Sequence, residues 1–555
     1  MTPATTNKIT VGELIARFLE RCGVKTAYGV ISIHNMPILD ALAQRGAIRF
    51  VSARGEAGAA SMADACARTT RSLGVCITST GTAAGNACGA MVEALTAGTP
   101  LLHITGQIES AYLDRDLAYI HEAPDQLTML KAVSKKAWRV RSAQTALATF
   151  KQAVFCAFSA PSGPVSVEVP IDIQAALIDV PEDWEPLLPL PLAPDEQAVQ
   201  HLADHLCQAR RPLLWLGGGA RGAQAAVARL VALGFGVVTS TQGRGVLAEE
   251  HPMSLGAYNL QAPIEAFYAS CDAMLVVGSR LRGNETLKYQ LKLPQPLCRI
   301  DADPAANGRG YASRHFVCGD AALTLDALAD HLQGRMNIDP SFAGDLRAAH
   351  VQAVGALRDG LGPYAQLVDA VQLAVGTHFN WVRDVTLSNS TWGNRELRLN
   401  DPWSGVHALG GGIGLGLAMA IGAATAAQTH GTARKTLLLA GDGGFVLNLG
   451  ELACAVQEKA DITVILMNDK SYGVIKNIQD SQYGGRRVYA ELHTPDYALL
   501  AQSMQFEHRR IGNLSEAPAA LADLMSRPGL KMLEIDMLAV GGFKTAFAGP
   551  PIKAV

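Results

Sequence analysis

The sequence predicts an α/β protein made of three doubly wound, parallel-sheet domains. A chain of 555 residues is too long for a single hydrophobic core. Short, β-rich apolar runs alternate with Ala-rich helical stretches along its whole length, a pattern typical of parallel sheets covered by helices on both faces. Two breaks in this pattern, one rich in proline and one polar, divide the chain into units of ordinary domain size.

The strand candidates form three groups along the chain. They are 75–80, 100–105 and 165–170 in the first group, 213–216, 237–241, 274–278 and 298–301 in the second, and 436–440, 462–467 and 532–535 in the third. Helical patterns lie between most of them, so consecutive strands are expected to run parallel. The most apolar stretch, 410–427, is short for a membrane span and carries six glycines. We therefore expect a buried, tightly packed helix there and no membrane insertion.

Two linkers set the expected domain boundaries. Residues 181–197 carry five prolines and cannot continue a helix or a central strand. The segment 335–362 is polar and only weakly periodic. We expect an N-terminal domain at 1–180, a central Rossmann-like domain at 195–335 and a C-terminal domain at 363–555, the first and last of which could share a fold.

Charge and cysteine content narrow the function classes. A net charge of -3 argues against a nucleic-acid binder, which normally carries a basic excess. The ten cysteines form no C-x-x-C pair or zinc spacing, and most lie among small apolar residues, so we expect buried thiols in a reducing compartment. The first ten residues lack the pattern of a signal peptide. A cytoplasmic protein is the expectation.

The most specific pattern is Gly-Asp-Gly-Gly at 441–444, directly after the apolar run TLLLA. A second run, ITVILM, leads to Asp469, 27 residues after Asp442. This spacing fits strand end, turn, helix and next strand, so both aspartates can lie at the carboxyl edge of adjacent strands, where ligands bind. Two carboxylates beside glycines and a helix N-terminus suit a diphosphate held through Mg²⁺. An ordinary Gly-Asp turn is the alternative interpretation of 441–444 alone.

Together the two elements resemble the cofactor motif of the thiamine-diphosphate enzymes related to acetohydroxyacid synthase, pyruvate decarboxylase and benzoylformate decarboxylase. That motif ends in Asn-Asn, and Asp469 stands at its second, metal-binding Asn. The resemblance implies Mg²⁺ ligands from Asp442, Asp469 and the backbone carbonyl of Ser471. Further cofactor contacts are implied for Gly441, Gly443, Gly444, Ser471 and Tyr472. The N-terminal domain would bind the cofactor's pyrimidine ring and the C-terminal domain its diphosphate.

A second part of the resemblance lies at Glu56. The segment GEAGAASMADACAR resembles the family's H-E-x-x-A-x-x-M-A-x-G-Y-A-R, with Gly55 in place of the His. The resemblance implies that Glu56 is the catalytic glutamate, which bonds to the aminopyrimidine ring and promotes loss of the thiazolium C2 proton. A carboxyl buried among Ala, Gly and Met is expected to have a raised pKa. The alternative is a first-turn glutamate that complements a helix dipole.

Other cofactor and substrate residues are also implied by resemblance. Ile413, in GGGIG, would separate the two cofactor rings, and the carbonyl of Gly411 would bond to the amino group. Ser390 and Thr391 align with diphosphate contacts of some members, although a polar turn is an equal alternative. The candidates for the substrate pocket are three residues of the N-terminal domain, His34, His121 and Gln107. Each also has a structural alternative, as a surface residue or as a partner of the backbone.

The expected function is decarboxylation of a 2-oxo acid or a carboligation that joins it to a second carbonyl compound, such as an aldehyde. A homodimer is the minimum implied by the resemblance, and a homotetramer is common in the family. The Gly-rich segment 217–219 and Arg280 and Arg282 leave FAD or ADP in the central domain as an option that we do not favour. The alternatives are a 2-hydroxyacyl-CoA or acyloin lyase, and a nucleotide-binding module without carbon–carbon chemistry.

Overall fold

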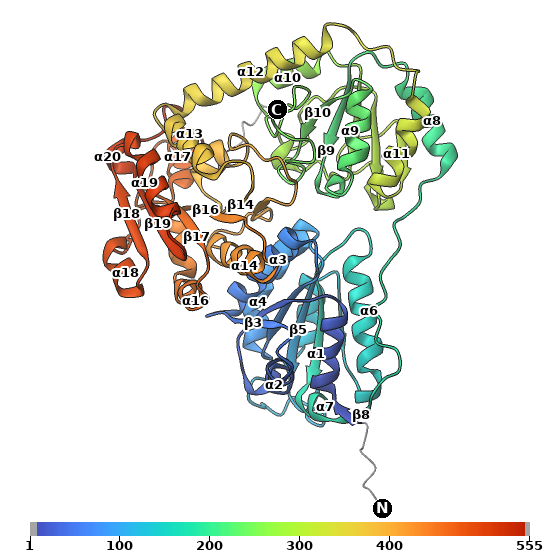
Figure 1. Cartoon of the computed structure of the whole chain (residues 1–555), viewed down its shortest axis with the longest axis vertical. Helices are drawn as coiled ribbons and strands as arrows, with labels where there is room; N and C mark the ends of the chain where they lie inside the picture. The colour runs from blue at the N-terminus through green and yellow to red at the C-terminus, as the bar shows by residue number, and fades with distance from the viewer. Residues whose placement is uncertain (1–7, 550–555) are drawn as a thin grey trace, which may run out of the picture.

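The computed structural model describes residues 8–549, which form three parallel sheets in three successive parts of the chain (Figure 1). The first sheet has the order β3-β2-β4-β5-β7-β6 and the third has the order β15-β14-β16-β17-β19-β18. Both sheets therefore place their strands in the same sequence of crossovers. The central sheet has five strands in the order β10-β9-β11-β12-β13. The predicted fold class is confirmed, and the outer two domains share one topology.

The N-terminal part contains the strands and helices nearest the start of the chain. They are β1 (Lys8–Thr10), α1 (Val11–Arg21), β2 (Thr26–Gly29), η1 (Ile33–Asn35), α2 (Met36–Arg45), β3 (Arg49–Ser52), α3 (Glu56–Thr70), β4 (Gly74–Thr78), α4 (Thr82–Ala97), β5 (Leu101–Gln107), α5 (Gln126–Val133), β6 (Lys136–Arg139), η2 (Ala143–Thr145), α6 (Ala146–Phe158), β7 (Val165–Pro170), α7 (Ile171–Ala175) and β8 (Leu177–Asp179). β1 and β8 form a separate antiparallel pair. Residues 181–195 then form no helix or strand.

The central part follows this linker. Its elements are α8 (Glu196–Leu206), β9 (Pro212–Leu216), η3 (Gly218–Ala220), α9 (Gln224–Ala232), β10 (Gly236–Thr239), α10 (Ala262–Tyr268), β11 (Ala273–Val277), η4 (Gly283–Glu285), β12 (Leu297–Asp301), η5 (Pro304–Ala306), β13 (His315–Cys318), α11 (Ala321–Leu332) and α12 (Phe342–Leu361). Burial on both faces explains the unbroken apolar runs of β9 and β11, whose residues are all buried.

The C-terminal part contains the sheet that carries the two aspartates. Its elements are α13 (Tyr364–Val375), β14 (Phe379–Arg383), the π-turn η6 (Asn389–Gly393), β15 (Gly405–His407), α14 (Gly416–Thr429), β16 (Lys435–Gly441), α15 (Asp442–Phe445), η7 (Val446–Asn448), α16 (Glu451–Gln457), β17 (Ile462–Asn468), α17 (Gly473–Gln482), α18 (Tyr497–Met504), β18 (Glu507–Ile511), η8 (Leu514–Glu516), α19 (Ala517–Met525), β19 (Leu530–Asp536) and α20 (Met537–Val540).

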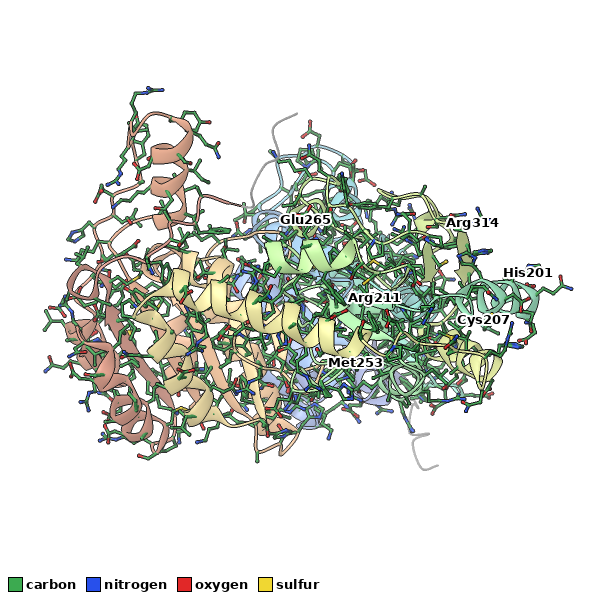
Figure 2. All side chains as sticks on the ribbon, turned by 90° about the horizontal axis from the view of Figure 1, so that it is seen from above. His201, Cys207, Arg211, Met253, Glu265 and Arg314 are labelled. Carbon is green, nitrogen blue, oxygen red and sulfur yellow. The ribbon has the colours of Figure 1, made fainter. Side chains whose placement is uncertain are left out.

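The weak periodicity of the polar segment 335–362 suggested an irregular linker. That expectation is wrong, because α12 occupies most of the segment. Phe342, Leu346 and Ala349 of this helix are buried in a core cluster of the central domain. Arg211 holds the start of the segment, with ion pairs of 2.9 Å to Asp339 and 2.7 Å to Asp345. Figure 2 shows Arg211 beside this long helix. The helix therefore connects the central and C-terminal parts as a packed element.

The N-terminal and C-terminal parts share one core. Of the most apolar segment, 410–427, the part from Gly416 onward forms the buried helix α14, as predicted, and it lies against α3 (Figure 1), whereas 410–415 form no helix. Met62 of α3 and Ile421 of α14 belong to the same buried cluster. A Cβ on Gly422 would lie 2.2 Å from the carbonyl oxygen of Met62, so glycine allows the two helix backbones to touch. No helix among residues 8–549 is both long and apolar enough to cross a membrane.

Candidate active site

Asp442 and Asp469 meet at the carboxyl edge of two adjacent parallel strands. β16 pairs with β17 through Gly441 and Met467, and each strand ends next to one of the two aspartates. Asp442 is 1% exposed, and neither of its carboxylate oxygens has a hydrogen-bond partner among the described residues. Burial, together with the charge of Asp469, raises the pKa of Asp442 to about 7. Burial also raises the pKa of Asp469.

The residues present at this edge fit a divalent cation. A buried carboxylate, Asp442, and its half-buried neighbour, Asp469, cannot both carry their charge cheaply without a cation, because they repel each other and lose hydration. The hydroxyl of Ser471 is buried beside them and likewise lacks a partner within residues 8–549. Among residues 8–549, no group of three or more His, Cys, Asp or Glu side chains could hold a metal ion. Two carboxylates with room for phosphate and backbone oxygens are the ligand set that suits Mg²⁺.

Gly443 and Gly444 directly follow Asp442 and are buried. A Cβ on Gly443 would lie 2.7 Å from the ring of Tyr472 and 2.8 Å from Leu492, so the backbone at this point is in close contact with the Asp469 loop. The expected helix after the motif is only four residues long, and η7 and α16 continue it as separate pieces. The motif thus presents its backbone to the same edge as the two aspartates.

Ile413 also reaches this edge. Its Cγ1 lies 3.2 Å from the position that a Cβ on Gly444 would occupy, and the side chain is 39% exposed. Gly411, two residues earlier, has a φ of +87°, a conformation that favours glycine. Sequence reasoning missed the residue that holds this segment, Asp384. Its carboxylate accepts hydrogen bonds from the N–H groups of Gly414 at 2.9 Å and Gly416 at 3.3 Å.

Ser390 and Thr391 lie in the π-turn η6. The hydroxyl of Thr391 donates to the carbonyls of Leu387 and Ser388, each at 3.0 Å. The side chain nearest to Gly441 is instead that of Thr386, whose Oγ1 lies 3.3 Å from the position of a Cβ there. The cofactor contacts of Ser390 and Thr391 stay predictions, and Thr386 is a further candidate that the sequence pattern did not single out.

Glu56 is the first residue of α3 and is half-buried, less than the sequence led us to expect. Its carboxylate accepts a hydrogen bond of 3.1 Å from the amide of Asn86 on α4. The backbone N–H groups of the two preceding residues, Arg54 and Gly55, donate to the buried carboxylate of Glu451 at 3.1 and 3.0 Å. Glu451 therefore also lies at the start of this helix. Glu56, in the first turn of α3, is placed as its alternative role at the helix dipole requires, and its catalytic role stays a prediction.

His34 and His121 come together although 86 residues of chain lie between them. Their ring centroids are 5.3 Å apart in an edge-to-face arrangement. His34 is 5% exposed, and its Nδ1 has no hydrogen-bond partner among residues 8–549. Burial, with the neighbouring His121, lowers the pKa of His34, which favours the neutral ring. A neutral imidazole with a free nitrogen is able to accept or return a proton near neutral pH.

Gln107 lies in a buried polar network at the end of β5. Its side-chain oxygen accepts from the hydroxyl of Thr80 at 2.9 Å and from the N–H of Ile108 at 2.8 Å. Gln126 and Glu168 complete the network through a hydrogen bond of 3.0 Å. These contacts satisfy the oxygen of Gln107 internally, so the structural alternative for this residue has direct support, while its catalytic role stays a prediction.

A cavity of about 280 Å³ lies where the central domain meets the other two. The Gly-rich turn after β9 contributes Gly218 and Gly219 to its lining, which also includes Arg280, Arg282 and Leu409. Arg282 also donates a hydrogen bond to the carbonyl oxygen of Leu409, at the start of the segment that carries Ile413. The two arginines thus line a cavity, and Arg282 is partly committed to a backbone carbonyl.

The chain matches known domain families along most of its length. Residues 9–129 match the thiamine pyrophosphate enzyme N-terminal TPP binding domain, residues 199–328 the central domain, and residues 387–535 the C-terminal TPP binding domain. These matches follow the order of the three sheets.

Similar proteins extend over nearly the whole chain. A probable 2-ketoarginine decarboxylase of Pseudomonas aeruginosa is 31% identical over 95% of this chain and 94% of its own length. The large subunit of acetolactate synthase isozyme 1 of Escherichia coli is 27% identical over 96% of this chain and 95% of its own length. A chloroplastic acetolactate synthase 2 of Zea mays is 26% identical over 94% and 84%. The chain belongs to the thiamine-pyrophosphate-dependent enzymes, with all three of their domains.

Proposed function

We propose that this chain is a thiamine-diphosphate-dependent enzyme that breaks or forms the carbon–carbon bond next to the carbonyl of a 2-oxo acid. The observation that carries the proposal is the pair of buried, unpartnered oxygens on Asp442 beside Asp469. A cation that bridges these carboxylates to a diphosphate would remove their repulsion. The similar proteins named for decarboxylation of 2-ketoarginine and for synthesis of acetolactate support the reaction class.

The proposed roles follow the placement of the side chains. Asp442, Asp469 and the carbonyl of Ser471 would hold Mg²⁺, and the backbone at 441–444 would receive the diphosphate. Bound thiamine diphosphate supplies the electron sink that the reaction needs. Glu56 would hold a proton at the aminopyrimidine nitrogen, and His34 with His121 would exchange protons with the substrate. Ile413 would keep the two cofactor rings in the orientation that brings them together.

The substrate is proposed to be a small 2-oxo acid, with an aldehyde or a second 2-oxo acid as acceptor in carboligation. The segment that carries His121 is acidic, with five carboxylates between 109 and 125, of which Asp114 pairs with Arg139 at 2.7 Å. An acidic segment next to His121 favours a substrate with a basic side chain, as 2-ketoarginine has. A 2-oxo acid with a guanidinium group is therefore the first compound to test beside pyruvate and an aryl 2-oxo acid.

The direct test is reconstitution of cofactor-free protein. We expect CO₂ release from at least one of the three 2-oxo acids only when thiamine diphosphate and Mg²⁺ are both present, and product condensation when an aldehyde is added. Glu56→Gln is expected to bind the cofactor and release no CO₂. If wild-type protein is stabilised by NAD and not by thiamine diphosphate with Mg²⁺, the nucleotide-binding alternative replaces this proposal.

We further propose that the active unit is at least a homodimer, commonly a homotetramer in this family. Within residues 8–549, the hydrogen bond of Glu56 is to Asn86, and none joins it to Asp442 or Asp469. A site shared between two subunits would bring these halves together. Subunits of Glu56→Gln and Asp442→Ala, inactive alone, should then regain about a quarter of the wild-type activity when mixed, because half of the dimers are mixed and each has one intact site. No recovery after subunit exchange would place both halves in one chain.

We propose that the enzyme requires no flavin in the cavity of the central domain. Arg282 already bonds to the carbonyl of Leu409, and no ribose-binding acid follows the Gly-rich turn at the usual spacing. Full activity after reconstitution with thiamine diphosphate and Mg²⁺ alone is the expected result, and a requirement for FAD or ADP would overturn it.

The ten free thiols suit the proposed cytoplasmic location. A 2-hydroxyacyl-CoA lyase remains the alternative, and cleavage of such a thioester would favour it.

A further inference from the structure

The segment 409–416, called here the ring loop, is fixed by side chains from all three domains. Arg282 of the central domain donates to the carbonyl of Leu409. Asp384 of the C-terminal domain accepts from the N–H groups of Gly414 and Gly416, and Asn448 donates to the carbonyl of Gly414 at 2.6 Å. A glycine-rich loop has little intrinsic preference for one conformation, so these contacts decide its shape.

The fourth of these side chains is Glu93, on α4 of the N-terminal domain. Its two carboxylate oxygens lie 2.9 and 2.8 Å from the N–H of Gly410, although 317 positions separate the two residues in the chain. Glu93 is 2% exposed. A Cβ on Gly410 would lie 2.7 Å from Glu93 Oε2, so only glycine allows this approach. The contact is therefore a charged, buried hydrogen bond to the residue directly before Gly411.

The carboxylate of Glu93 is itself held from behind. Arg68 Nη2 lies 3.8 Å from it, and Arg68 also pairs with Asp64 at 2.6 Å and donates to the carbonyl of His407 at 2.7 Å. His407 is the last residue of β15, the strand that leads into the ring loop. Burial raises the pKa of Glu93, while the charge of Arg68 and the N–H of Gly410 oppose that rise. One buried network thus fixes both the entry to the loop and its first glycine.

We propose that Glu93 is a positioning residue, which sets Gly411 and Ile413 against the two rings of thiamine diphosphate. The inference rests on the proposed function, because it concerns the same cofactor. Glu93 acts through Gly410 and does not touch the diphosphate end, which Asp442 and Asp469 would bind through the cation. Loss of Glu93 leaves the start of the loop with Arg282 alone, so binding of the rings would have to order the loop again.

The test compares a ligand that has the rings with one that lacks them. Glu93→Ala removes the acceptor, and Glu93→Asp keeps the charge beside Arg68 but is shorter by one methylene and cannot reach Gly410. In both variants we expect thiamine diphosphate with Mg²⁺ to bind on the order of tenfold more weakly, as for loss of a hydrogen bond to a charged group. Inorganic pyrophosphate with Mg²⁺ should bind as in the wild type. Exchange of the C2 proton of bound cofactor in D₂O should slow in parallel.

Two further variants sharpen the comparison. Glu93→Gln keeps one oxygen for Gly410 and should stay close to wild type in both affinities. Glu458→Gln removes the ion pair of 2.7 Å with Arg49, which also joins the N-terminal and C-terminal domains but lies away from the ring loop. It should change neither ligand affinity. An equal loss of thiamine diphosphate and pyrophosphate affinity in Glu93→Asp, or no loss of either, would overturn the role of Glu93. Failure of the wild type to bind thiamine diphosphate would instead overturn the proposed function.

Discussion

Replacing Gly422 by Ala should weaken the packing between the N-terminal and C-terminal domains, which share a core. Gly422 lies where α14 crosses α3, and a Cβ there would lie 2.2 Å from the carbonyl oxygen of Met62 and 2.6 Å from its Cα. Both are backbone atoms of a helix, so no side chain can turn away to make room. Because ordinary carbon contacts begin near ~3.5 Å, the helices must move apart by about 1 Å.

The expected cost follows from this displacement. Overpacking of a well-packed core costs about 1–3 kcal/mol, which exceeds the ~0.5–1 kcal/mol that Ala gains over Gly in a helix. The hydroxyl of Tyr28, which bonds to the carbonyl of Gly422 at 3.2 Å and to Thr425 at 3.0 Å, would lose its geometry as well. Since α14 directly follows the ring loop, the affinity for thiamine diphosphate should fall together with the stability.

The assay is urea unfolding, followed by circular dichroism, together with titration of the cofactor. The matched control is Gly355→Ala in α12, where no atom lies within 4 Å of the added Cβ. We expect Gly422→Ala to lower the unfolding midpoint and Gly355→Ala to raise it slightly, with unchanged cofactor affinity in the control. If Gly422→Ala unfolds at the wild-type midpoint or above it, the close contact of the two helices is wrong.

Three more predictions concern single side chains. Asp469→Asn, which restores the family's usual residue, should retain binding of Mg²⁺ and thiamine diphosphate because an amide oxygen remains, whereas Asp469→Ala should weaken it at least tenfold in a calorimetric titration. Asp384→Ala should free Gly414 and Gly416 and lower the cofactor affinity about tenfold, while the affinity for pyrophosphate changes less. Burial lowers the pKa of His103 from 6.5 to about 4, so the unfolded chain takes up its proton first, and about 3 kcal/mol of stability should be lost as the pH falls from 6.5 to 4.

Each of these has its own contrary outcome. Equal cofactor affinity in Asp469→Asn and Asp469→Ala would mean that the side chain is not a ligand. For Asp384, a parallel loss of pyrophosphate binding would point to general damage at the sheet edge. His103→Gln, which can keep hydrogen bonds to Thr78 and Ser166, should reduce the acid sensitivity of the unfolding midpoint. An unchanged pH profile in that variant would assign the sensitivity to other groups, such as the buried His407.

Local sequence patterns were sufficient for much of the fold. Each predicted strand range overlaps a strand of the structure, and 165–170 coincides with β7. These strands are buried on both faces, so their apolar runs are unbroken. Among the strands outside the predicted ranges are the edge strands β6 and β18, whose sequences, KAWR and EHRRI, are short and partly face water, and the buried strand β14. α12 was missed because its buried residues are few and lie among many exposed ones.

The sequence by itself determined where the two aspartates of the candidate site lie. Asp442, Asp469 and their glycines lie at strand ends, and a strand end is encoded by the residues next to it. It equally determined the order of the three domains. The position of the aspartates at strand ends and the order of the domains do not depend on contacts between segments far apart in the chain.

Only the tertiary structure decided which side chains hold the ring loop and the start of α3. Glu93 meets Gly410 across 317 positions, and Glu451 meets Arg54 across 397. In the sequence each is one glutamate of a helix, with nothing nearby to mark it. The partner of a buried charge is chosen by the packing of whole domains, because an isolated carboxylate enters a core only where distant N–H groups or cations are brought to it.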